Sequence, residues 1–256
     1  MSSTDIHPLR RWFTKYARSF YSDDADVQAH VRLKEEHTVR VCERMDELSD
    51  SLVLTPEQKT LAQMVALFHD VGRFQQYTQY RTFNDFRSED HACMGVRILQ
   101  ETGVLSKLPE AQQSLVHKAV RYHNGREIPP DSEDAVFFAR MIRDADKLDI
   151  LEMLTSSDEL VRMMPMPEYA GQQQVSPSTL EYILQGNVAR FEHIHTAADL
   201  MLFRMSWVFD MNFPWTFRQV QEKKYLEKMA SQLPRTSDVE TVTEYLMVQC
   251  ERRING

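Results

Sequence analysis

The chain has 256 residues, 42% hydrophobic and 27% charged, which indicates a globular protein of one large domain or two small ones. Its net charge of −8 argues against binding to a nucleic-acid polymer, because phosphate neutralisation needs clustered Lys and Arg. We expect a cytoplasmic protein without a membrane partner, because the sequence has no signal-peptide pattern, no long apolar run and only three widely spaced cysteines.

Nearly every segment has a helical period and only 7 glycines occur, so the sequence predicts an all-α fold. Residues 75–88 are aromatic and polar without a clean period, which predicts a loop, and residues 156–179 contain three prolines and predict a loop or lid. A second helical block follows from about 180 to 251, and Pro214 must interrupt it. The predicted helices of the first half cover about 31–49, 55–71, 89–102, 110–123 and 132–155.

Local signals place several helix ends. Thr55 can cap the second helix, and Gln58 completes a capping box. Gly72 is predicted to stop that helix, and Gly103 to stop the helix that Ser88 caps.

Three histidines lie on helix stripes that should face the core: His37, His69 and His123. One such residue alone would be an ordinary core histidine. Three on different helices, one of them followed directly by Asp70, indicate a shared metal ion, because buried imidazole and carboxylate groups are costly unless paired or coordinated. This ligand mix suits Mn, Fe, Co, Ni or Zn, and Mg less well.

A further carboxylate should come from the segment "MIRDADKLDIL". Asp144 and Asp146 lie on two different apolar faces of the same predicted helix, and Asp149 is a third candidate. Both faces are apolar, so the helix is predicted to be central, and periodicity does not choose between the aspartates.

The ordered set of His37, His69-Asp70 and a late aspartate resembles the HD superfamily of metal-dependent phosphohydrolases over about residues 30–150. "EEHTVRV" resembles the first-histidine helix of the family, "LFHDVGRF" its HD signature, and "DADKLD" its closing element. In that closing element the metal-binding aspartate follows an alanine, which points to Asp146. The longer pattern is similar to an uncharacterised bacterial branch of the family.

Two more histidines match the dinuclear members of the family. "DHACMGVRIL" is similar to a segment that supplies His91, and "AVRYHNGREIP" resembles one in which His123 binds a second metal. The cyclic-dinucleotide phosphodiesterase branch has a second histidine where this chain has Asn124, and a glutamate where it has Leu33. These departures argue against cyclic di-GMP as the substrate. His117, in the same helix as His123, is expected to be a spare.

The resemblance implies one or two divalent ions: His37, His69, Asp70 and Asp146 on the first, and His91 and His123 on the second, with Asp70 bridging. With the helical pattern of the rest of the chain, we expect an N-terminal helical segment (1–29), an HD metal-binding domain (30–155), a loop or lid (156–179) and a C-terminal helical extension packed on the HD domain (180–256). The aromatic C-terminal block is expected to line the pocket, to form a homodimer interface, or both.

The implied activity is hydrolysis of a phosphate ester or anhydride in a nucleotide or other small phosphorylated metabolite. Besides Asp70, Arg73 and Lys147 are the residues expected to act in catalysis, as cations that face the phosphate. The aromatic loop from Tyr77 to Phe86 is expected to pack as core rather than to stack on a base. Most of the other nearby cations are expected to be solvated: Lys34, Arg40, Arg81, Arg121 and Arg126.

Two alternatives remain open from the sequence. The same ligand pattern matches the diiron oxygenase branch of the superfamily, although "HDVGR" and "DADKLD" are more similar to the hydrolases. The second alternative is a non-catalytic domain that senses a small molecule, and the complete set of six metal-ligating residues argues against it.

Overall fold

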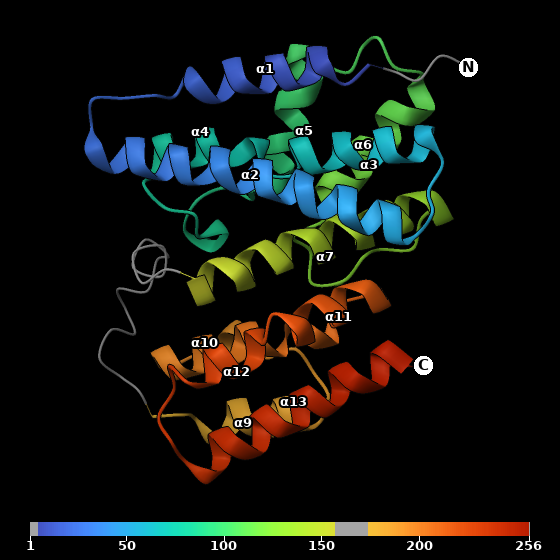
Figure 1. The fold of residues 1–256 in the computed structure, drawn as a ribbon. Coiled ribbons are helices and arrows are strands. Elements are labelled where there is room, and N and C mark those ends of the chain that lie inside the picture. Colours follow the sequence, from blue (N-terminus) through green and yellow to red (C-terminus); the bar gives the residue numbers. More distant parts are fainter. Residues whose placement is uncertain (1–4, 157–173, 256) are drawn as a thin grey trace. The chain divides into compact units, whose positions relative to one another are not determined.

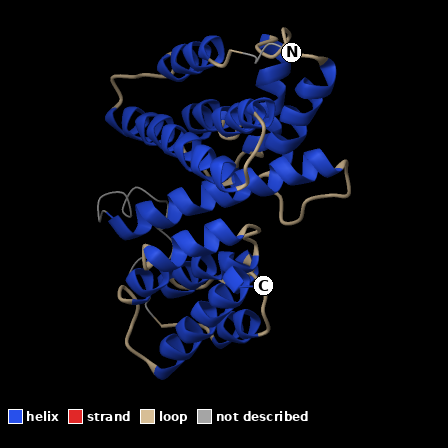
Figure 2. Cartoon of the chain, turned by 45° about the vertical axis from the view of Figure 1, so that its right-hand side comes forward, coloured by secondary structure: helices blue, strands red, loops and turns tan. Residues whose placement is uncertain are grey.

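The computed structural model describes residues 5–156 and 174–255, and within these ranges it contains helices and no strand (Figures 1 and 2). The predicted all-α class is confirmed. The helices of the first half are α1 (His7–Arg18), α2 (Ala25–Ser51), α3 (Pro56–Phe68), α4 (Val71–Tyr80), η1 (Asp85–Arg87), α5 (His91–Thr102), α6 (Glu110–Tyr122) and α7 (Glu133–Ser156). Those of the second half are α9 (Pro177–Leu184), η2 (Phe191–His193), α10 (Ala197–Met205), η3 (Ser206–Phe209), α11 (Pro214–Glu222), α12 (Tyr225–Ala230) and α13 (Ser237–Asn255).

The chain divides into two compact units, Met1–Asp146 and Lys147–Gly256, so that α7 begins in the first and ends in the second. Most of the predicted loop or lid at 156–179 lies outside the described residues, and α9 already begins at Pro177. None of the helices described is both long and apolar enough to cross a membrane.

The first unit is built on α2, which packs against α3 and α4, while α5 packs between α4 and α6. The side chain of Asp24 caps α2, which begins at Ala25 rather than at about residue 31 as predicted. Thr55 and Gln58 form the predicted capping box of α3. Phe68 and Phe74 are fully buried and make edge-to-face contacts with aromatic rings of α1, Phe68 with Trp12 and Phe74 with Phe13. These contacts fix the junction between α3 and α4, where His69 and Asp70 lie.

The second unit has its own core, to which the end of α7 and helices α9 to α13 contribute. Leu202, Met205, Phe217, Met229 and Leu246 are almost completely buried in it. The predicted interruption at Pro214 is confirmed, because α11 begins there and proline suits the first turn of a helix.

The prediction of a loop at 75–88 is wrong for its first part, because α4 continues to Tyr80. Val71, Phe74 and Tyr77 are spaced by three and bury one face, and Gln76 is fully buried beside them. The helix ends instead at Arg81, whose backbone is left-handed (φ 55°) and whose N–H donates to the carbonyl of Tyr77 at 2.8 Å.

The predicted roles of Gly72 and Ser88 are also wrong. Gly72 lies inside α4, and the predicted helix 55–71 ends earlier, at Phe68. A Cβ on Gly72 would lie 2.2 Å from the carbonyl oxygen of His91, so glycine is required for the close approach of α4 and α5 rather than for a helix stop. The cap of α5 is Asp90, whose carboxylate accepts from the N–H of Cys93 at 2.7 Å. Gly103 does end that helix, with φ 59°.

Gly72→Ala is expected to destabilise the protein by about 2–3 kcal/mol, because the new methyl group overlaps backbone atoms that have no room to move. Urea unfolding measures this. Gly95→Ala is the matched control on the facing helix, since its Cβ would meet a side-chain methyl of Val71 at 3.3 Å and needs only a small shift. Equal stabilities of the two variants would contradict the close backbone contact.

Candidate metal centre

Four histidines and one aspartate meet in the first unit, each placed by a different helix or helix end. His37 lies within α2, His69 and Asp70 at the junction of α3 and α4, His91 at the first residue of α5, and His123 at the end of α6. All five are buried, with at most 4% of each residue exposed. The structure therefore brings together five of the six metal ligands that the resemblance implies.

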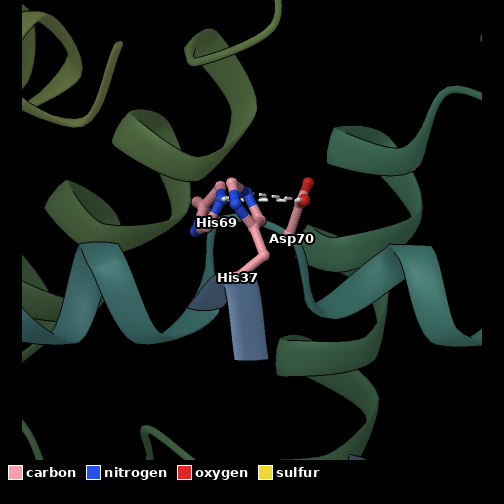
Figure 3. A group of neighbouring side chains, drawn as sticks. All are labelled: His37, His69 and Asp70. Carbon is pink, nitrogen blue, oxygen red and sulfur yellow. Dashed lines mark hydrogen bonds and ion pairs between the residues drawn. The ribbon is translucent and has the colours of Figure 1, made fainter. Parts of the chain in front are cut away.

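Asp70 divides its two carboxylate oxygens between two pairs of histidines. Oδ2 lies 3.6 Å from Nε2 of His37 and 3.7 Å from Nε2 of His69. Oδ1 lies 3.2 Å from Nε2 of His91 and 3.7 Å from Nε2 of His123. Figure 3 shows His37 reaching from α2 toward His69, with Asp70 facing them. Each pair together with Asp70 forms a group of ligand atoms within 4.8 Å of one another. Asp70 precedes α4, but its side chain makes no capping hydrogen bond to that helix, so its carboxylate faces the histidines instead.

Asp146 is the aspartate of α7 that lies beside the first pair. Its Oδ1 is 3.1 Å from Nε2 of His37 and 3.9 Å from Nε2 of His69, and its side chain is 20% exposed. The sixth residue of the implied ligand set is thus at the edge of the cluster nearest to solvent.

The outer nitrogens of three imidazoles are held by hydrogen bonds that set their tautomers. Nδ1–H of His69 donates to the carbonyl of Ala66 at 2.8 Å, and Nδ1–H of His123 donates to that of Val120 at 2.7 Å. Nδ1 of His91 lies 2.8 Å from Oδ2 of Asp85. With the proton on Nδ1, each Nε2 presents a lone pair to the cluster, as a metal ligand must.

A cation fits this arrangement. Nε2 of His91 and Nε2 of His123 are 3.1 Å apart. This short distance is not a hydrogen bond between the two nitrogens, because each ring carries its proton on Nδ1 and neither Nε2 has one to donate. Two facing lone pairs repel, whereas a positive ion bound by both nitrogens and by the anionic Oδ1 of Asp70 satisfies all three. The donor chemistry of nitrogen and carboxylate oxygen suits a first-row divalent metal.

The electrostatic environment keeps these groups in their ligand forms. Burial lowers the pKa of His69 to about 4, so its imidazole is neutral at pH 7. Burial alone would raise the pKa of Asp70, but Lys34 and the surrounding histidines outweigh it and hold that pKa well below 3.8. Burial likewise opposes ionisation of Asp146, yet its hydrogen bond with His37 lowers its pKa.

Asp85 is a member of this site that the sequence did not indicate, because it lay in the predicted loop. Its carboxylate accepts from His91, from the amide of Gln76 at 2.7 Å and from Arg73 at 3.2 Å. Its pKa is lowered, since hydrogen bonding by His91 and the charge of Arg73 outweigh the cost of burial. The one available signal was an acidic residue six positions before a histidine that starts a helix. A carboxylate behind a ligand imidazole orients the ring and raises its basicity.

The two cations expected at the phosphate have protein partners. Nη1 of Arg73 donates to Gln76, to the carbonyl of Phe83 and to Asp85, at 2.6–3.2 Å. Lys147, in the second unit, pairs with Asp210 at 2.7 Å. A role for either in catalysis stays a prediction. Lys34, expected to be solvated, instead has its ammonium 2.7 Å from Oδ2 of Asp70.

Asp85→Asn is expected to weaken metal binding by the His91–His123 pair by about 10–100-fold, because the amide is a poorer acceptor for Nδ1–H of His91. Calorimetric titration of metal-depleted protein with Mn²⁺ measures the effect. Asp131→Asn is the control, since Asp131 also accepts hydrogen bonds, from Lys118 at 2.6 Å and Tyr122 at 2.8 Å, but touches no residue of the cluster. Unchanged affinity in Asp85→Asn would rule out the supporting role of Asp85.

A family model described as HD domain matches residues 35–151, a range that contains His37, His69, Asp70, His91, His123 and Asp146. Comparison with curated proteins and with solved structures gives no significant match.

Proposed function

The chain belongs to the HD-domain family through residues 35–151, and from this premise we propose that it is a metal-dependent phosphohydrolase acting on a nucleotide or other small phosphorylated metabolite. The observation that carries the proposal is the division of Asp70 between two histidine pairs. One buried carboxylate that faces two sets of imidazole nitrogens suits a pair of ions with a bridging ligand.

His37, His69, Asp70 and Asp146 would hold one ion, and Asp70, His91 and His123 a second. Bound there, Mn, Fe, Co, Ni, Mg or Zn would supply Lewis-acid stabilisation of phosphoryl charge and activation of water near neutral pH. The protein's own contribution is orientation. Asp85 and the carbonyls of Ala66 and Val120 fix three rings, while burial keeps His69 neutral.

A screen of phosphate compounds tests the proposal. Metal-depleted protein is reloaded separately with Mn²⁺, Co²⁺, Ni²⁺ or Mg²⁺ and offered nucleoside mono-, di- and triphosphates, cyclic nucleotides and sugar phosphates. We expect turnover of at least one compound, only in metal-loaded protein, followed as released phosphate or by nucleotide chromatography.

His69→Ala should lose the ion that His37, His69, Asp70 and Asp146 would hold, and turnover with it. The matched control is His117→Ala, whose imidazole has a pKa lowered by burial but no ligand role in the cluster. Absence of turnover by fully metal-loaded protein across the panel would overturn the proposal. Stoichiometric iron with oxygen uptake would instead support the oxygenase alternative.

A further inference from the structure

Lys34 lies on the same face of α2 as His37, one turn earlier, and its side chain is only 15% exposed. Its ammonium donates to Oδ2 of Asp70 at 2.7 Å, and this is the oxygen that faces His37 and His69. The cation nearest to the other oxygen, Oδ1, is more distant: Nε of Arg73 lies 3.5 Å from it. The two halves of the cluster are therefore not equivalent.

A divalent ion held by His37 and His69 would need the same oxygen. A metal–carboxylate bond is about 2.0–2.2 Å long, so the ion and the ammonium of Lys34 would both contact the same carboxylate oxygen in a buried site. The two like charges repel there with little screening. Binding of the ion on this side and the contact between Lys34 and Asp70 must then oppose each other.

Lys34 has a second partner besides Asp70. Its ammonium lies 5.3 Å from the centre of the Phe83 ring, which is a favourable cation–π distance. The guanidinium of Arg73 lies 5.6 Å from the centre of the same ring. Tyr77 packs against the Phe83 ring, with the ring centres 4.8 Å apart. A flexible four-carbon stem lets the ammonium move away from Asp70 and remain beside the centre.

We propose that Lys34 is a phosphate-binding residue of this centre: it competes with the metal ion for Oδ2 of Asp70, and on metal binding its ammonium turns to the phosphate of the substrate. This inference rests on the proposed function, because it takes a phosphate as the anion that the centre receives. It makes Lys34 the link between metal uptake and recognition of the phosphate.

The competition is tested by calorimetric titration of metal-depleted protein with Mn²⁺, in a His123→Ala background that leaves the His37–His69 side to be measured. Lys34→Met is expected to bind Mn²⁺ roughly tenfold more tightly, because the opposing charge is gone. Lys59→Met is the control, since Lys59 is likewise paired with an aspartate, Asp50, but at the surface. Lys34→Gln provides a second neutral variant should Lys34→Met fold poorly. If Lys34→Met and Lys34→Gln bind Mn²⁺ no more tightly than the His123→Ala protein that retains Lys34, the proposed competition is overturned.

The phosphate role is tested separately, with inorganic phosphate titrated into Mn²⁺-loaded protein. Lys34→Met should bind phosphate about tenfold more weakly, while Lys34→Arg, which keeps the charge, should stay within about threefold. Equal phosphate affinity in the protein and in Lys34→Met would overturn this part.

The outcomes separate this inference from the proposed function. If no variant, nor the unaltered protein, binds Mn²⁺, the metal centre itself is refuted. If Mn²⁺ binds with the same affinity whatever stands at position 34, the inference about Lys34 alone is refuted.

Discussion

Asp70→Asn is expected to abolish metal binding at both histidine pairs and to lower phosphate release by at least roughly 10³-fold. The reason is that, among the residues that the structure describes, Asp70 is the one carboxylate that contacts both pairs, with a different oxygen for each. An amide retains the shape of the side chain but presents one neutral oxygen. Metal content of the purified variant and the rate of phosphate release measure the two effects.

The single-histidine variants sharpen this expectation. His123→Ala should lose one ion and retain the other, because His37, His69 and Asp146 remain together. His117→Ala, in the same helix and outside the cluster, should keep the metal content of the unaltered protein. If Asp70→Asn retained as much metal as His123→Ala, Asp70 would belong to one site and not to two.

Arg143→Met is expected to destabilise the protein by about 3–5 kcal/mol. Arg143 is only 4% exposed, and its guanidinium donates to the carbonyls of Tyr122 at 3.1 Å, His123 at 3.3 Å and Gly125. Without it, buried carbonyls at the end of α6 lose their donor, and the segment that carries His123 loosens. Denaturant unfolding measures the change in the free energy of unfolding.

Arg140→Met is the matched control, because Arg140 lies on the same helix, one turn earlier, and is exposed. It should change stability by no more than about 0.5 kcal/mol. A similar loss in both variants would mean that charge on α7, rather than the hydrogen bonds to the end of α6, accounts for the effect.

Several features of the fold could be predicted from the sequence because they depend on neighbouring residues. The helical period of apolar residues predicted the all-α class, the Thr55 capping box predicted the start of α3, and Gly103 predicted the end of α5. The histidines on apolar stripes, and the order of the HD motifs, indicated which residues could gather around a metal. The apolar period, the capping box and the glycine stop each act within about two helical turns.

The tertiary structure decided what depends on contacts between helices. Gly72 is required by the backbone of α5, and Gln76 is buried although it is polar. A period along one helix records neither. Asp85 reaches His91, and Lys34 reaches Asp70, from 6 and 36 residues away. The choice among the aspartates of α7 was likewise open to periodicity, and it is the approach of α2 that puts Asp146 beside His37. Sequence spacing restricts which side chains share a helix face, but only packing determines which faces meet.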